Sequence, residues 1–441
     1  MLSYQGKNVV IIGLGISGLS CVNYFLSKNI VPKVIDTRIQ PSGLDQLDPR
    51  IETHTGSFCL DWILNADLLV VSPGIALFTP EIVKASQKGI EIVGDIELFC
   101  REINAQKNKK IIAITGANGK TTVTTLVGKI IADAGIKVGV GGNIGKPALS
   151  LLQDDCDVYV LELSSFQLET TQSLQAYAAT ILNISEDHTD RYPNGLMQYV
   201  AAKQSIYSNA KNCIINSDDK LTYPQVKNDN QQIITFGLHN AKYHLDTDYH
   251  YLMIDNENLL NTNHMQLLGV HNYLNVLSAL AMTDVLGIDR QVSLKTIASF
   301  KGLPHRFELV YKNKGVSWIN DSKATNVGST EAALNSVVCH GTLFLLLGGD
   351  GKSADFAPLI SYLKRPHIKI FCFGKDKSAL SKLRPEVTTI IDTMEQAMQQ
   401  IAKQVKAEDV VLLSPACASY DQFKNYNHRG EVFAQLAKEL G

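Results

Sequence analysis

Short apolar segments alternate with amphipathic stretches along most of the chain, and this alternation predicts its secondary structure. Runs such as 9–12, 68–71 and 111–114 consist of Val, Ile, Leu and Ala. The segments after them repeat apolar residues at helical spacing. Strands that alternate with helices in this way form parallel sheets covered by helices. The chain is therefore predicted to be an α/β protein.

Polar or proline-marked connections divide this pattern into three blocks. Because 441 residues exceed the roughly 250–300 that one hydrophobic core organises, several domains are expected. We predict domains at 1–100, 101–302 and 303–441. Short alternating segments at 242–268 predict a small antiparallel addition to the second domain.

Charge and cysteine content exclude several classes of function. The 41 basic and 43 acidic residues give a net charge of -2, so no global field attracts nucleic acid or an anionic membrane. No run of about 18 apolar residues is present to span a bilayer. The eight cysteines include no Cys-x-x-Cys pair, which argues against a zinc site or a disulfide framework and fits a reducing cytoplasm. The oligomeric state is not determined by the sequence, and a monomer is expected.

The first glycine-rich loop, Gly13-Leu-Gly15-Ile-Ser-Gly18, lies between a predicted strand and a predicted helix. Asp36 ends the next strand, about where a dinucleotide-binding fold places its ribose carboxylate. Arg38 weakens the dinucleotide interpretation. Helix N-termini bind any phosphate, so a nucleotide diphosphate sugar suits the loop equally well. A purely structural turn is the remaining alternative.

A second loop, AITGANGKTT at 113–122, resembles a phosphate-binding loop shortened by two residues. Gly116 and Gly119 allow the backbone to wrap a phosphate, Lys120 can neutralise β and γ oxygens, and the Thr121 hydroxyl can ligate Mg²⁺. An ordinary turn with a solvated lysine is the alternative. We interpret the loop as a triphosphate site.

Three residues gain meaning beside that loop. Glu162 ends a predicted strand, where its carboxylate could hold Mg²⁺ or cap a helix. His188 follows another strand, at the edge where α/β sheets gather ligands, although loop histidines are usually surface residues. Lys203 falls in phase with the apolar positions of its helix and is predicted to point inward; the alternative is a side chain that snorkels to solvent.

Together these motifs resemble the Mur ligases, and among them the branch that adds D-glutamate. The resemblance covers nearly the whole chain, in the family's order. The segments that carry it are TGANGKTT, LELSSFQLE, NISEDHTDRYP, HNYLN, GLPHRFE, NDSKATN and SPACASYDQFKNYNHRG.

The resemblance implies a fold and a reaction. The fold is a Rossmann-like N-terminal domain, a central P-loop domain with a parallel sheet, and a Rossmann-like C-terminal domain. In the reaction, the carboxylate of UDP-N-acetylmuramoyl-L-alanine attacks the γ-phosphate of ATP, which gives an acyl phosphate and ADP. The amine of D-glutamate then displaces phosphate. Mg²⁺, as two ions, and a bacterial cytoplasmic location are also implied.

The resemblance further assigns roles to residues. Catalysis is assigned to Lys120, Glu162, His188 and Lys203. The ATP-binding set is Gly116, Asn118, Gly119, Lys120, Thr121, Thr122, Asn272, Arg306, Asp321 and Lys323. The set for the UDP substrate is Gly15, Ile16, Ser17, Thr37, Arg38, Gly74, Asn143 and His188. D-glutamate is assigned to Lys352, Ser419 and Tyr426. The metal ligands are Thr121, Glu162, His188 and Lys203 as its carbamate.

Three other classes use part of these features. An NAD-dependent dehydrogenase would use the first glycine-rich loop but leave the P-loop idle. A folylpolyglutamate synthase shares the short P-loop, yet would not need a UDP-binding domain. A non-catalytic nucleotide-gated module remains possible for any P-loop fold, and ADP production that depends on the acceptor amino acid would exclude it.

Overall fold

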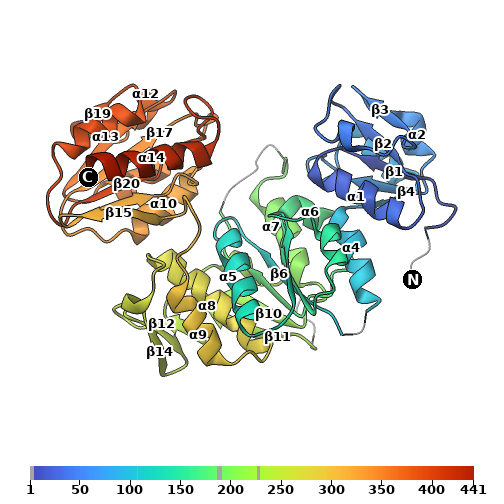
Figure 1. The fold of residues 1–441 in the computed structure, drawn as a ribbon, viewed down its shortest axis with the longest axis horizontal. Coiled ribbons are helices and arrows are strands. Elements are labelled where there is room, and N and C mark those ends of the chain that lie inside the picture. The colour runs from blue at the N-terminus through green and yellow to red at the C-terminus, as the bar shows by residue number, and fades with distance from the viewer. Residues whose placement is uncertain (1–3, 107, 186–190, 226–228) are drawn as a thin grey trace. The chain divides into compact units, whose positions relative to one another are not determined.

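The computed structural model describes residues 4–106, 108–185, 191–225 and 229–441, which form two compact units (Figure 1). Unit 1 comprises Met1–Asp246, Met253–Leu259 and Asn275–Ile297, and unit 2 comprises the remaining residues. Unit 1 contains a parallel sheet and most of a second, larger sheet, and unit 2 contains a third sheet that is parallel apart from one antiparallel strand pair; mostly parallel sheets are what the alternation of strands and helices predicts.

The first sheet of unit 1 is parallel, with the strand order β3-β2-β1-β4-β5. Its strands are β1 (Val9–Ile12), β2 (Lys33–Asp36), β3 (Thr53–Thr55), β4 (Leu68–Val71) and β5 (Glu91–Val93), and its helices are α1 (Ile16–Ser27), α2 (Leu60–Leu64), α3 (Pro80–Gln87) and α4 (Asp95–Asn104). Alternate residues of β1 face opposite cores: Val9 and Ile11 pack into one, Val10 and Ile12 into the other. Burial on both faces explains why this strand is continuously apolar.

The second sheet of unit 1 has the order β14-β13-β12-β11-β10-β9-β6-β8-β7. Its central strands are β6 (Lys110–Thr115), β7 (Val138–Gly142), β8 (Val158–Glu162), β9 (Ala178–Ile181), β10 (Asn212–Asn216) and β11 (Gln232–Phe236), joined in parallel. The accompanying α-helices are α5 (Lys120–Asp133), α6 (Ser165–Glu169), α7 (Leu196–Gln204), α8 (Val270–Val285) and α9 (Arg290–Ser299), and the 3₁₀ helix η2 spans Ala148–Gln153. One hydrophobic core joins the first sheet, α4 and this sheet.

The segment predicted to be a small antiparallel addition forms β12 (Tyr243–Leu245), β13 (Tyr251–Ile254) and β14 (Glu257–Asn261). These strands extend the central sheet beyond β11, and β12 pairs with β11 in parallel, not antiparallel, orientation. The predicted position is therefore correct, whereas the orientation of the first added strand differs from the prediction.

The sheet of unit 2 has the order β15-β16-β20-β17-β18-β19, antiparallel only between β15 and β16. Its strands are β15 (Glu308–Asn313), β16 (Val316–Asn320), β17 (Leu343–Gly348), β18 (Ile368–Phe373), β19 (Thr388–Ile390) and β20 (Val410–Leu413), and its helices are α10 (Val327–Ser336), α11 (Ile360–Leu363), α12 (Lys377–Ser381), α13 (Met394–Ala402) and α14 (Tyr426–Leu440). In Figure 1, α13 and α14 lie side by side in the orange-to-red part of the chain. Within the described residues, no helix combines the length and the apolar character needed to cross a membrane.

Candidate functional site

The shortened P-loop connects β6 to α5 and is shaped by its two glycines. Gly116 and Gly119 have φ of 152° and 84°, a region that favours glycine. A Cβ on Gly119 would also collide with the side chain of Asn275. The loop is held further by Asn183, whose Oδ1 accepts from the Asn118 N–H at 2.8 Å and whose Nδ2 donates to the Asn118 carbonyl at 3.1 Å. Sequence reasoning missed both Asn183 and Asn275 because neither belongs to the loop itself.

Two lysine amines converge on this loop. Lys120 Nζ donates to the carbonyls of Gly116 at 2.8 Å and Ala117 at 2.9 Å. Lys203 Nζ donates to the same Gly116 carbonyl at 3.0 Å and to Thr115 Oγ1 at 3.2 Å. Lys203 is only 2% exposed and its amine lies 4.7 Å from the centre of the Tyr199 ring. The prediction that Lys203 points inward is confirmed, and the snorkelling alternative is excluded.

Glu162 ends β8, directly beside β6. Its Oε1 accepts from Asn143 Nδ2 at 2.9 Å, whereas its buried Oε2 has no hydrogen-bond partner among the described residues. A buried carboxylate oxygen without a partner is energetically unfavourable unless a cation or donor binds it. Glu162 therefore fits the oxygen ligand that a hard divalent cation requires.

The rest of the predicted metal set is only partly described. His188 lies outside the described residues. Thr121 is in the first turn of α5, at the P-loop. Within the described part of the chain no three His, Cys, Asp or Glu side chains cluster as metal ligands. Of the predicted metal ligands in the described part of the chain, only Glu162 has one of these four side-chain types. Thr121 would bind through its hydroxyl and Lys203 through its carbamate.

A pocket of about 660 Å³ in unit 1 collects the residues predicted for the UDP substrate. Seven of the eight line it, and His188 is the one outside the described residues. The lining residues from this set are Gly15, Ile16, Ser17, Thr37, Arg38, Gly74 and Asn143. Ser72 and Gln167 also line it, although sequence reasoning did not select them. Helix α1 begins at this pocket with no side-chain cap and no acidic residue in its first turn, which leaves its N-terminal N–H groups available to an anion.

Asp36 is not available as a ribose acceptor, which argues against the dinucleotide interpretation. Its Oδ1 accepts from Arg38 N and Nε at 2.8 and 2.9 Å, and its Oδ2 from Leu14 N and Arg38 Nη2, both at 2.7 Å. Burial alone would raise the pKa of Asp36, but these hydrogen bonds outweigh it and lower the pKa to about 2. Asp36 instead orients Arg38 at the pocket.

Unit 2 holds the remaining predicted ATP residues. Asn272 lies in the first turn of α8 and donates to the Leu268 carbonyl at 2.7 Å. Burial raises the pKa of Asp321 to about 7, although Ser414 Oγ and the Phe307 N–H donate to its carboxylate. Lys323 Nζ lies 4.0 Å from the centre of the Tyr426 ring. Arg306 lies in a turn and comes between Asn272 and Asp321 in the sequence.

The residues predicted to bind D-glutamate come shortly after chain segments that contact one another in unit 2. Asp350, two residues before Lys352, forms a bridge with Ala418, the neighbour of Ser419. The buried Arg429 links these segments, since it donates to the carbonyls of Ser322, Gly348 and Cys417 and to Ser322 Oγ. Tyr426 begins α14, the helix that carries Arg429. Sequence reasoning missed Arg429 because its partners are distant in the chain.

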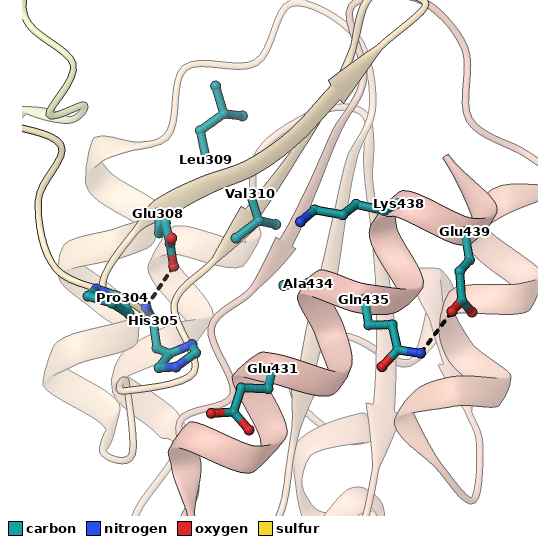
Figure 2. A pocket seen from close by; sticks show the side chains of 10 residues that line it. All are labelled: Pro304, His305, Glu308, Leu309, Val310, Glu431, Ala434, Gln435, Lys438 and Glu439. Carbon is teal, nitrogen blue, oxygen red and sulfur yellow. Dashed lines mark hydrogen bonds between the residues drawn. The ribbon is translucent and has the colours of Figure 1, made fainter.

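A different pocket in unit 2, of about 610 Å³, lies between β15 and α14 (Figure 2). None of the predicted site residues lines it. Figure 2 shows the Glu308 carboxylate accepting from the His305 N–H and Gln435 bonded to Glu439. Three glutamates against one lysine, Lys438, make its lining acidic, which is unfavourable for an anionic ligand.

Fold and site together define a class: a three-domain α/β protein with a shortened P-loop and a separate pocket at the N-terminus of α1. Three family models match the chain, described as "Mur ligase MurD-like, N-terminal domain" at residues 7–94, "Mur ligase middle domain" at 114–283 and "Mur ligase, glutamate ligase domain" at 305–417. The chain belongs to the Mur ligase family. The predicted three-domain fold is thereby confirmed.

Named relatives agree with this assignment. The chain is 59% identical to UDP-N-acetylmuramoylalanine--D-glutamate ligase of Escherichia coli K12 and 57% identical to that of Pectobacterium atrosepticum, each over 443 residues and 100% of both chains. Among solved structures it resembles the UDP-N-acetylmuramate-alanine ligase of Thermotoga maritima, with a TM-score of 0.59, 18% identity and coverage of 98% and 99%. A D-alanyl-D-alanyl-adding ligase of Acinetobacter baumannii gives a TM-score of 0.60, 16% identity and coverage of 99% and 92%; these two likenesses concern the fold.

We predict that Gly119→Ala and Gly135→Ala differ in their effect on nucleotide binding. Both glycines have positive φ, 84° and 77°, at opposite ends of α5, so alanine at either should lower the free energy of unfolding by about 1–2 kcal/mol. Only the alanine at Gly119 also displaces Asn275, because nothing lies within 4 Å of a Cβ at Gly135. Calorimetric titration with ATP should show a loss of about tenfold or more for Gly119→Ala alone. Equal ATP affinities in the two variants would contradict this account of the loop.

Proposed function

We propose that the chain is an ATP-dependent, ADP-forming ligase that adds D-glutamate to UDP-N-acetylmuramoyl-L-alanine. It would act in peptidoglycan precursor synthesis in the bacterial cytoplasm. The observation that carries this proposal is the 59% identity, over the full length of both chains, to an enzyme named for that reaction. The residues assigned to the two nucleotides lie at a P-loop and in a separate pocket, which supports it.

The first step needs a group that neutralises the transferred phosphoryl. Lys120, at the start of α5, is the cation for the β and γ oxygens of ATP, and the loop N–H groups and the helix N-terminus orient them. The L-alanine carboxylate then attacks the γ-phosphorus, and ADP leaves. Gly116 and Gly119 allow the close approach of the backbone that this requires.

Mg²⁺ would supply charge neutralisation and polarise the phosphate oxygens when bound. Thr121, Glu162, His188 and carbamylated Lys203 are the proposed ligands. The free Oε2 of Glu162 supports the assignment. The shared hydrogen bond of Lys120 and Lys203 to one carbonyl also supports it, because two ammonium groups so placed repel each other. Carbamylation of Lys203 would turn that repulsion into attraction.

The second step needs the acceptor amine beside the acyl phosphate. D-glutamate would be held by Lys352, Ser419 and Tyr426 through its two carboxylates, and its amine displaces phosphate through a tetrahedral intermediate. Asn272, Arg306, Asp321 and Lys323 are proposed as further ATP-binding residues. Arg38 and the N-terminus of α1 would receive the uridine diphosphate.

Phosphate release is predicted to depend on all three substrates. With UDP-N-acetylmuramoyl-L-alanine and ATP present, D-glutamate should support turnover, whereas L-alanine, L-lysine and diaminopimelate should not. Reactions that lack the UDP substrate serve as the background. Efficient turnover with a diamino acid would assign the chain to another branch of the family, and phosphate release without any amino acid would indicate a nucleotide-gated module.

Lys120→Ala is predicted to abolish ADP formation while binding of the UDP substrate survives, because the two phosphate sites lie at different helices, α5 and α1. Calorimetry with each nucleotide separates the two effects. Lys129→Ala, also on α5 but paired with Asp133 at the surface, is the matched control and should retain both ADP formation and binding of the UDP substrate. If Lys120→Ala weakened the binding of ATP and of the UDP substrate equally, two independent sites would be excluded.

Lys203→Ala is predicted to be nearly inactive and to recover partly in acetate, which can occupy the position of the carbamate. Lys203→Arg should stay inactive at every acetate concentration, because a guanidinium is not carbamylated. Lys211→Ala is the control, because it removes another lysine that lies over a tyrosine ring. The activity of this variant should not change with acetate concentration. Mass spectrometry or electron density can detect the carbamate in the wild type. A Lys203→Ala variant with the wild-type rate would refute the proposed role.

A further inference from the structure

Asp95, the first residue of α4, is buried, and burial disfavours its charge more than the N–H groups at the start of its helix favour it. The residue is only 2% exposed, and neither carboxylate oxygen has a hydrogen bond of good geometry within the part of the chain that the structure describes. Burial raises the pKa of Asp95 to about 6. A carboxylate in this position lowers the stability of the fold whenever it is ionised, so stability does not account for it.

Burial raises the pKa of Asp95, and it is opposed by backbone N–H groups at the start of α4 and by two side chains, those of Gln167 and Ser17. Both line the pocket that we assign to the UDP substrate. Ser17 belongs to α1 and Gln167 to α6, so the two come from the two different sheets of unit 1. Asp95 therefore interacts with one polar residue from each of the two parts that form the pocket.

The hydrogen bonding of Gln167 leaves its amide nitrogen to face Asp95. The Gln167 Oε1 already accepts from Ser164 N at 3.0 Å and from Ser164 Oγ at 3.3 Å, in the capping box of α6. The amide nitrogen Nε2 is the donor available to the Asp95 carboxylate, and it carries two hydrogens. One can bind Asp95 while the other is directed to an acceptor in the pocket.

The Ser17 hydroxyl has a comparable position. It lies in the first turn of α1, where the N–H groups have no side-chain cap. A serine hydroxyl has one hydrogen to donate, and donation to Asp95 would hold the side chain away from those N–H groups. The N-terminus of α1 then remains open to a phosphate.

We propose that Asp95 is a positioning residue of the nucleotide-substrate pocket, which holds the Ser17 hydroxyl and the Gln167 amide in the orientations that bind the substrate's anionic diphosphate. This inference rests on the proposed function of the pocket. A buried carboxylate next to two donors that line a binding site is the arrangement expected when outer residues orient those in contact with the ligand. An ionised carboxylate offers two oxygens that only accept, one for each donor, whereas the amide in Asp95→Asn offers one oxygen and an NH₂ group that cannot accept.

Glu97, two residues further along α4, provides an internal comparison. It is also 2% exposed, but its carboxylate accepts from the N–H groups of Gln172 and Ser173 at 2.8 Å and from Arg101 Nε at 2.7 Å. Burial would raise the pKa of Glu97, yet these bonds outweigh it and lower the pKa. None of these partners lines the pocket. Glu97 thus stabilises the fold, whereas Asp95 does not.

The other ionisable groups around Asp95 do not compensate its charge. Helix α1 presents Cys21, whose pKa burial and Asp95 raise. Helix α4 itself carries Glu97 and Cys100, and also Arg101, which pairs with Glu97 and Glu91, and Glu102, which pairs with Lys28. Of the other elements that pack on α4, η2 has no ionisable side chain, and α6 has Glu169, which pairs with Arg191. No cation is therefore recorded beside Asp95 among the described residues.

The test compares Asp95→Asn with Glu97→Gln in the intact enzyme, by steady-state kinetics and thermal unfolding. Asp95→Asn should raise the KM for UDP-N-acetylmuramoyl-L-alanine about tenfold, with the KM for ATP unchanged. Its Tm should equal or exceed that of the wild type, and the gain should appear as the pH rises above about 4 and be complete above the pKa of about 6. Glu97→Gln should lower Tm and leave the KM for the UDP substrate unchanged.

A double-mutant cycle adds a second measurement. Gln167→Ala should have a smaller effect in the Asp95→Asn background than in the wild type, because the carboxylate acts through Gln167. If Asp95→Asn does not fold, Asp95→Ser replaces it. A wild-type KM in a folded Asp95 variant, or equal losses for all three substrates with a lower Tm, would overturn the proposal. An inactive wild type would instead refute the proposed function. In that case, the role of Asp95 in the pocket would still be supported if calorimetry showed weaker binding of UDP to Asp95→Asn than to the wild type.

Discussion

The carbonyl oxygen of Gly116 accepts hydrogen bonds from the amines of both Lys120 and Lys203, and the geometry of the nucleotide site depends on this shared contact. Lys120 belongs to α5 and Lys203 to α7, so one backbone atom ties the P-loop to a helix more than eighty residues further along the chain. Two amines held this close concentrate positive charge at the loop. A bound anion, or an anionic form of one lysine, would lower that repulsion, in line with the triphosphate site proposed here.

Parallel sheets explain how the other groups come to this place. The carboxyl ends of parallel strands meet at one edge of a sheet, where loops carry side chains from distant parts of the sequence. Thr115 ends β6 and Glu162 ends β8, its neighbour in the sheet. In the N-terminal sheet, Asp36 ends β2 and Ser72 follows β4, and both line the pocket at the N-terminus of α1. The same architecture therefore gathers the residues of both proposed nucleotide sites.

Several buried ionisable groups in the two units have strongly shifted pKa values. Burial raises the pKa of Asp95 to about 6 and that of Asp321 to about 7, and it lowers the pKa of Arg429 to about 10. Arg429 is fully buried and offers its charge to backbone carbonyls. Strongly shifted pKa values cluster at functional sites, although structural hydrogen-bond networks such as that of Arg429 also produce them.

The sequence by itself determined the elements whose signals are local. The apolar runs of the central strands, the glycines of the P-loop and the helical phase of Lys203 can all be read over a few residues, because strand and helix periodicity are properties of neighbouring positions. Short strands such as β3 and β19 were not predicted, since three mostly polar residues carry no periodic signal. The family's motifs added the identity of the site.

Only the tertiary structure decided which distant residues support that site. Asn183 and Asn275 at the P-loop, Gln167 and Asp95 at the substrate pocket, and Arg429 in unit 2 act on partners far away in the chain. Asp36 could be a ribose acceptor from its spacing alone, and its hydrogen bonds to Arg38 show that it is not free to be one. The physical reason is that burial and hydrogen-bond geometry depend on chain segments that come together only in the folded protein.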